Sequence, residues 1–339
     1  MASAPSIYAA DPAYPILAHT LLATPESKAV DTEKPVPEAA HNLDWNLKED
    51  WDAGIQGTKA GIFRCGTTIG FSRLRARSKD NEDYIGQIPR HLLTSHLLGT
   101  APSSEPSAFI IHPSNFDAFA PKTLLNALQS SSRQPGLSRD EAIQRLGSVQ
   151  LLPVQNLPSA MQAITKVSEL LQELQERRQA QQNTVETPNQ PVILIVAGLD
   201  TLAEGVIRAS NPVRGAALLA ATLRALTRMS RVYASWLSII LVNISGLGPA
   251  HFENYQPPES TQTKRPSDED TRPSGDDDIH SIFQTPGHSL LSTLLMKTLD
   301  QGIDTHILLS DVKAAQVAEV IKDRVGTGLG KWGIWSPKR

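Results

Sequence analysis

Cysteine is almost absent from this chain. Only one of its 339 residues is a cysteine, Cys65, so no intrachain disulfide can form. A zinc cluster built on cysteines is excluded for the same reason, and the nine histidines lack the spacing typical of metal ligands. We therefore expect no metal centre, no catalytic triad among the scattered histidines, and a protein of a reducing compartment.

Long hydrophobic runs and an excess of positive charge are lacking as well. No apolar segment approaches the ~18 residues of a membrane-spanning helix. No Lys or Arg precedes Lys28, although a secretory signal begins with a basic region. The net charge of -3 provides no overall basic field for nucleic acid. The expectation is a soluble intracellular protein, in which any contact with nucleic acid comes from a local patch.

Two segments rich in proline and polar residues lack a sustained hydrophobic period. Residues 1–45 are predicted to be a flexible tail, and residues 249–288 a disordered insertion inside a folded domain. The tail is a candidate docking peptide because it contains two short apolar segments, Tyr14–Leu17 and His19–Leu22. The rest of the chain, 46–339, is predicted to form one domain.

Apolar runs alternate with amphipathic helices along that domain. The continuous aliphatic runs at 192–196 and 237–242 are typical of strands buried on both faces. Ser138 and Glu141 have the spacing of a capping box, which begins a helix. Further strands are predicted at 108–111, 149–152, 305–309, 318–321 and 333–335, helices at 138–146, 159–180 and 213–234, and either element at 289–300. This order predicts an α/β fold with a mostly parallel central sheet, helices on both faces and an antiparallel edge extension.

Four segments resemble the RecA-type core of the eukaryotic strand-exchange recombinases and their paralogs. Phe109–Leu125 resembles the second core strand and the turn after it, and Val192–Gly215 resembles the Walker B strand and its continuation. Ser238–Asn243 is similar to the next strand, after which the family carries its second DNA-binding loop. Leu290–Trp335 resembles the antiparallel end of the core. The resemblance implies a RecA-like P-loop NTPase fold over about residues 48–336.

The P-loop that the resemblance implies is degenerate. A P-loop reads G-x-x-x-x-G-K-[ST], in which backbone amides and the lysine hold phosphate and the hydroxyl holds magnesium. The nearest match begins at Gly61 and continues through Gly66, Thr67 and Thr68, so Thr67 stands in the place of the lysine. We interpret this segment as a plain turn, with retained binding of ATP and magnesium as the alternative.

Two further requirements of phosphoryl transfer are unmet at the matching positions. The segment that resembles Walker B continues into Ala197, and Asp200 comes three residues later, where it is expected to cap the next turn. The turn 112–115, where the family has its catalytic glutamate, contains no carboxylate. Together with Thr67, these losses predict a pseudo-ATPase, without catalytic residues.

Three basic clusters are candidates for contacts with DNA or a partner. They are Arg73, Arg75 and Arg77; Arg224, Arg228 and Arg231, which share one helix face; and Lys322, Arg324 and Lys331, near Trp332 and Trp335. Cations beside aromatic rings are typical of nucleic-acid binding, and cations on a helix face bind phosphates. The alternatives are an exposed loop for the first, a solvated helix face for the second and an inward-packed terminal strand for the third.

Function is predicted from the resemblance. It implies a nuclear accessory subunit that acts in DNA repair by homologous recombination, as a hetero-oligomer with another RecA-like subunit and with possible DNA contact. One alternative is an ATPase-dead RecA-like subunit of another assembly, such as the cytoplasmic Elongator complex that modifies transfer RNA. The other is a divergent DNA-dependent ATPase whose missing lysine is supplied elsewhere, for example by Lys59 or Lys79.

Overall fold

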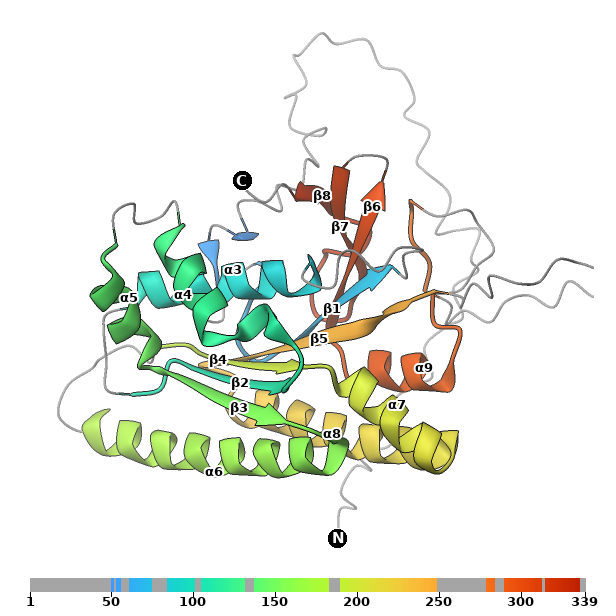
Figure 1. Cartoon of the computed structure of the whole chain (residues 1–339), viewed down its shortest axis with the longest axis horizontal. Helices are drawn as coiled ribbons and strands as arrows, with labels where there is room; N and C mark the ends of the chain where they lie inside the picture. Colours follow the sequence, from blue (N-terminus) through green and yellow to red (C-terminus); the bar gives the residue numbers. More distant parts are fainter. Residues whose placement is uncertain are drawn as a thin grey trace, which may run out of the picture. The chain divides into compact units, whose positions relative to one another are not determined.

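The structure, a computed structural model, places the greater part of the predicted domain (Figure 1). It describes residues 50–51, 53–55, 61–74, 84–100, 105–131, 137–182, 190–248, 279–283, 290–312 and 315–335. The predicted tail and most of the predicted insertion lie outside these residues. In the described part, no helix is both long enough and apolar enough to cross a membrane.

An eight-stranded sheet forms the centre of the fold, in the order β3-β2-β4-β5-β1-β6-β7-β8. The strands from β3 to β6 in this order pair in parallel, whereas β7 and β8 are antiparallel additions at one edge. The strands are β1 (Thr68–Leu74), β2 (Ala108–Pro113), β3 (Val149–Val154), β4 (Val192–Ala197), β5 (Leu237–Leu247), β6 (Thr305–Val312), β7 (Ala315–Asp323) and β8 (Trp332–Trp335). The predicted α/β class with an antiparallel edge extension is confirmed.

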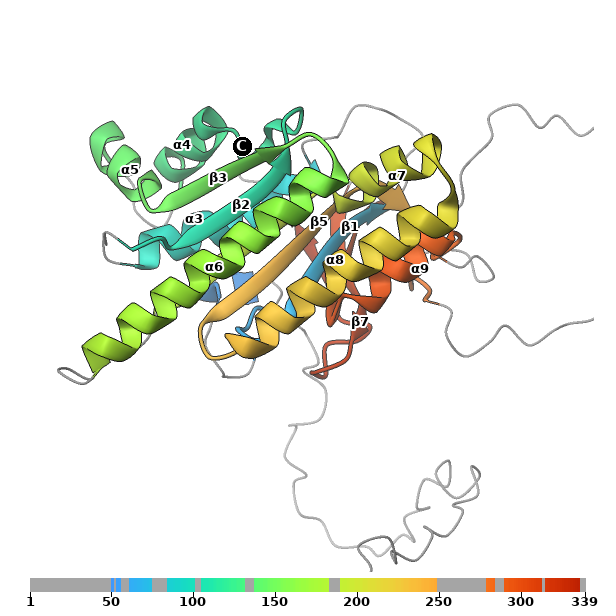
Figure 2. The ribbon, with the colours of Figure 1, turned by 90° about the horizontal axis from the view of Figure 1, so that it is seen from below.

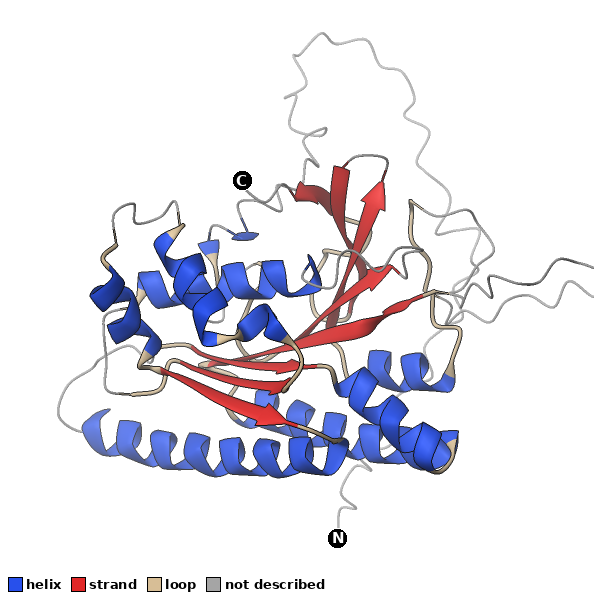
Figure 3. Cartoon of the chain, viewed as in Figure 1, coloured by secondary structure: helices blue, strands red, loops and turns tan. Residues whose placement is uncertain are grey.

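Helices cover both faces of the sheet (Figures 1 and 3). One face carries α3, α4 and α5, and the other carries α6, α8 and α9, which lie in front of the sheet when the fold is seen from below (Figure 2). The helices are α3 (Tyr84–Gly99), the short 3-10 helix η1 (Asp117–Phe119), α4 (Pro121–Gln129), α5 (Arg139–Leu146), α6 (Leu157–Gln182), α7 (Leu199–Ala209), α8 (Pro212–Val232) and α9 (Leu294–Gln301). Among them, α3, α6, α7 and α8 pack directly against strands of the sheet, where their apolar residues are buried.

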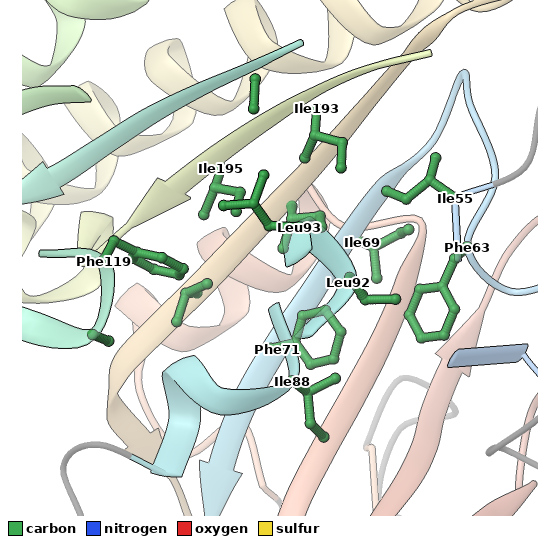
Figure 4. Close-up of a cluster of buried hydrophobic side chains, with 14 of the residues drawn as sticks. Ile55, Phe63, Ile69, Phe71, Ile88, Leu92, Leu93, Phe119, Ile193 and Ile195 are labelled. Atoms are coloured by element: carbon green, nitrogen blue, oxygen red, sulfur yellow. The ribbon is translucent and has the colours of Figure 1, made fainter. Parts of the chain in front are cut away.

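Alternation along β1 divides its side chains between two hydrophobic cores. Ile69 and Phe71 point to the α3 side, where they pack with residues such as Ile88 and Leu92 (Figure 4). The alternate residues Gly70 and Ser72 face α8 and α9, because successive strand side chains point to opposite faces of the sheet. Ser72 is fully buried there, so β1 presents a polar group to the second core.

Periodicity predicts most of these elements correctly, but it does not find β1 or α3. The capping box at Ser138 is confirmed, and helix α9 occupies most of the segment 289–300, where either element is expected. β1 lacks a continuous apolar run because Gly70 interrupts it; a side chain there would collide with Ile303. In α3, Pro89 lies inside the helix, although proline is unfavourable within a helix, so the sequence pattern there does not indicate one.

Candidate functional site

The glycine-containing segment that matches part of a P-loop precedes β1, so it is not at the position of a P-loop. A P-loop joins the carboxyl end of a strand to the start of a helix. Gly61, Gly66 and Thr67 precede β1, and Thr68 is its first residue. The junction between β1 and α3 is instead residues 75–83, which lie outside the described residues.

The segment before β1 is held by a charged clasp. The guanidinium of Arg231 donates to the carbonyl of Gly66 (2.5 Å) and to Oδ1 of Asp304 (2.7 Å). Oδ2 of Asp304 accepts the backbone N–H of Thr68 (2.9 Å). The left-handed backbone at Gly66 (φ 78°) brings its α-carbon against Ala234, where a side chain would collide. These contacts fix where β1 begins, so the glycine has a structural role.

Cys65 lies in the same segment and is buried. Burial raises the pKa of its thiol from 9.0 to about 12, because an apolar environment disfavours the thiolate. The thiolate is the reactive form, so we expect iodoacetamide to modify the native protein at least about tenfold more slowly than the unfolded chain. Mass spectrometry of samples taken with and without denaturant measures both rates. Equal rates would contradict the buried position of the thiol.

A chain of buried polar groups crosses the second core from β7 to β5. Lys322 donates from Nζ to Oδ2 of Asp300 (2.5 Å), and Oδ1 of Asp300 lies 2.9 Å from Nδ1 of His306. Nε2 of His306 lies 2.8 Å from Oγ of Ser72. The amide of Asn243 donates to the same hydroxyl (2.8 Å). We call these five residues the polar chain; they join α9 to four strands of the sheet.

Opposing effects set the ionisation of this polar chain. Burial raises the pKa of Asp300, but its hydrogen bonds and electrostatic interactions with His306 and Lys322 outweigh this effect, so the pKa is lowered overall. Burial lowers the pKa of Lys322, although Asp300 acts in the opposite direction. The carboxylate therefore has a proton donor on each side, which compensates for its removal from water.

Ser72, His306 and Asp300 have the connectivity of a hydrolase triad, which sequence analysis does not find. In such a triad the serine hydroxyl must reach a substrate carbonyl. Ser72 and His306 have no exposed surface. Ser72 also accepts a hydrogen bond from Asn243. The polar chain is therefore a structural tie across the sheet, because no substrate can reach its serine.

Asp200 binds the neighbouring strand and does not cap its own helix, which corrects the sequence-based expectation. Its Oδ2 accepts both the backbone N–H (2.6 Å) and the hydroxyl (2.5 Å) of Ser245 in β5. The N-cap of α7 is Gly198, whose residue type offers no side chain for the role. Asp200 is fully buried in the first turn of α7, which follows β4, so it ties the start of this helix to β5.

The residues of the three predicted basic clusters differ in their exposure and in their contacts. Arg224 and Arg228 are exposed on α8, but Arg231 of the same stripe is part of the clasp with Asp304. Lys322 is engaged by Asp300, and Arg324 donates to the carbonyl of Gln301 (3.1 Å). The remaining candidates are Lys331, which is partly exposed beside β8; Arg73, which is half-buried in β1; and Arg75 and Arg77, which lie outside the described residues. Among the described candidates, Arg231, Lys322 and Arg324 are thus engaged within the fold, whereas Arg224 and Arg228 are exposed.

The comparisons with known proteins concern the fold of this chain and do not address its function. The sequence matches no protein-family model, and a search of curated proteins finds no match. Among solved structures, the crystal structure of the RadB recombinase is similar with a TM-score of 0.43 and 12% sequence identity, over 80% of this chain and 86% of that chain. The strand order and the parallel register show an α/β fold with a mostly parallel sheet and an antiparallel edge extension.

Proposed function

We propose that this chain is a RecA-like accessory subunit that does not hydrolyse ATP and acts by binding a related subunit. The observation that carries the proposal is the sequence between β1 and α3. A P-loop at this junction needs glycines, so that backbone amides can surround phosphate, and a lysine followed by Ser or Thr. Residues 75–83 contain no glycine, and Lys79 is followed by Asp80.

Two other positions support the loss of catalysis. β4 ends in Ala197, so the strand that would present the magnesium-binding aspartate ends in a methyl group. The turn after β2 contains Ser114 and Asn115, with no carboxylate to activate water. The proposed loss of ATP hydrolysis therefore rests on these positions and not on Thr67, which lies before β1.

Homologous recombination in the nucleus is the proposed setting, with another RecA-like subunit as the partner and DNA as a further ligand. Arg224 and Arg228 stay candidates for these contacts because they are exposed on α8. An assembly such as Elongator, in the cytoplasm, is the competing setting for a RecA-like subunit without ATPase activity. The partners recovered from cell extract with the tagged full chain distinguish the two: recombination subunits support the proposal, and Elongator subunits contradict it.

Hydrolysis itself is tested with the purified chain, magnesium and ATP, with and without single-stranded DNA. We expect phosphate release equal to that of a blank without protein. The variants Lys79→Ala, at the β1–α3 junction, and Lys59→Ala, before β1, are measured in parallel. Release above the blank that either Lys79→Ala or Lys59→Ala abolishes would contradict the proposal and identify a divergent ATPase, and the variant that abolishes it would identify the lysine.

A further inference from the structure

β8 is the last strand of the sheet, and its outer side is open in the described part of the chain (Figure 1). The N–H of Val320 in β7 donates to the carbonyl of Lys331 (2.8 Å), and the register then pairs Ala318 with Gly333. Along an antiparallel ladder, hydrogen-bonded residue pairs alternate with pairs whose N–H and C=O groups point away from the partner strand. The N–H and C=O groups of Trp332 and Ile334 therefore point away from β7. An unpaired strand edge of this kind is a template for another strand.

The two faces of β8 have different surroundings. Trp335 points inward, where its ring packs edge-on against Trp51 with centroids 4.7 Å apart. Trp332 and Ile334 point to the other face and are 45% and 59% exposed. The strand thus presents two large apolar side chains at alternate positions beside its open backbone edge.

A short segment from the end of the predicted insertion extends this apolar surface. The buried carboxylate of Glu319, the ladder neighbour of Trp332, accepts the N–H of Ile282 (2.8 Å) and the hydroxyl of Ser281 (2.6 Å). This fixes Ile282, which is 58% exposed, and places the ring of Phe283 at 5.3 Å from that of Trp332. We call Ile282, Phe283, Trp332 and Ile334 the edge patch.

A lysine lies beside the edge patch. Of the cations that follow Asp323 in the sequence, Arg324 donates to the carbonyl of Gln301, and Lys338 and Arg339 lie outside the described residues. Lys331, which directly precedes β8, makes no ion pair with the described residues. Two copies of this edge would repel each other, so a second copy of the chain is a poor occupant. An acidic partner is complementary.

We infer that the open edge of β8 binds an extended acidic peptide segment of another protein, which adds as a ninth strand. The edge supplies backbone hydrogen bonds through Trp332 and Ile334, and the edge patch accommodates apolar side chains at alternate positions of the peptide. Lys331 pairs with an acidic side chain of the peptide. A nucleic acid fits less well, because the exposed aliphatic side chains do not stack on bases and Phe283 packs against the ring of Trp332. This inference does not depend on the proposed function.

The test selects peptides of about ten residues from a random displayed library against the full chain. We expect the selected peptides to be acidic, with apolar residues at every second position. Ile334→Pro removes an outward N–H without removing a hydrogen bond to β7, so it should weaken their binding at least about tenfold. Lys331→Glu should weaken it similarly, whereas Lys297→Glu, which reverses an exposed charge on α9, should not.

Thermal unfolding of Ile334→Pro shows whether the variant keeps its fold, and Lys331→Glu tests the same edge without a backbone change. The inference is overturned if the selected peptides are basic or lack the alternation. It is also overturned if their binding survives both variants. Binding of single-stranded oligothymidine that Lys331→Glu abolishes, with no effect of that variant on the peptides, would assign the edge to nucleic acid instead.

Discussion

Replacing Asp300 with alanine is expected to lower the free energy of unfolding by about 3–5 kcal/mol, because it leaves a buried lysine without its counter-charge. Lys322 and His306 both lose their partner in this variant. The polar chain also links α9 to the sheet, so the loss extends beyond one ion pair. Chemical denaturation followed by circular dichroism measures the change.

The matched control for this prediction is Asp311→Ala, which removes an exposed carboxylate from β6. We expect it to change the free energy of unfolding by less than about 0.5 kcal/mol. The double variant Asp300→Ala with Lys322→Met should recover part of the loss, since it also removes the unpaired charge. Equal effects of Asp300→Ala and Asp311→Ala would show that the polar chain does not stabilise the fold.

The central strands could be predicted because their local composition indicates that they are buried. β4 and β5 are continuous aliphatic runs, and a run of this kind has few alternatives to a strand buried on both faces. β1 is equally central but contains Gly70 and Ser72, so its composition resembles that of a turn. The sequence therefore gives no sign of β1, and the nearest glycines that match a P-loop, Gly61 and Gly66, precede this strand.

The polar chain could not be predicted, because its members come together only in three dimensions. Ser72 and His306 are 234 positions apart in the sequence, and no periodicity relates them. The one available signal is a polar residue on the buried face of an otherwise apolar strand, as at Asn243 in β5. Such a residue needs a hydrogen-bonding partner. Sequence alone does not identify that partner.

His96 in α3 is expected to make the protein sensitive to acid. Burial is the main cause that lowers its pKa from 6.5 to about 4, and hydrogen bonds with the backbone of Ser107 and Pro191 offset only part of this. A histidine whose pKa is lower in the folded state takes up its proton on unfolding. Its contribution is therefore fully present above pH 6.5 and is lost as the pH falls towards 4, with a total of about 3 kcal/mol.

The variant His96→Gln isolates this contribution, because glutamine does not titrate. Denaturation at a series of pH values should show that the wild type loses about 3 kcal/mol more than His96→Gln as the medium is acidified from neutral. His280→Gln removes an exposed histidine and should follow the wild type. If His96→Gln and the wild type lose stability in parallel, acid destabilisation comes from other groups. A difference confined to the acidic range would instead place the buried neutral imidazole among the groups that hold α3 against the sheet.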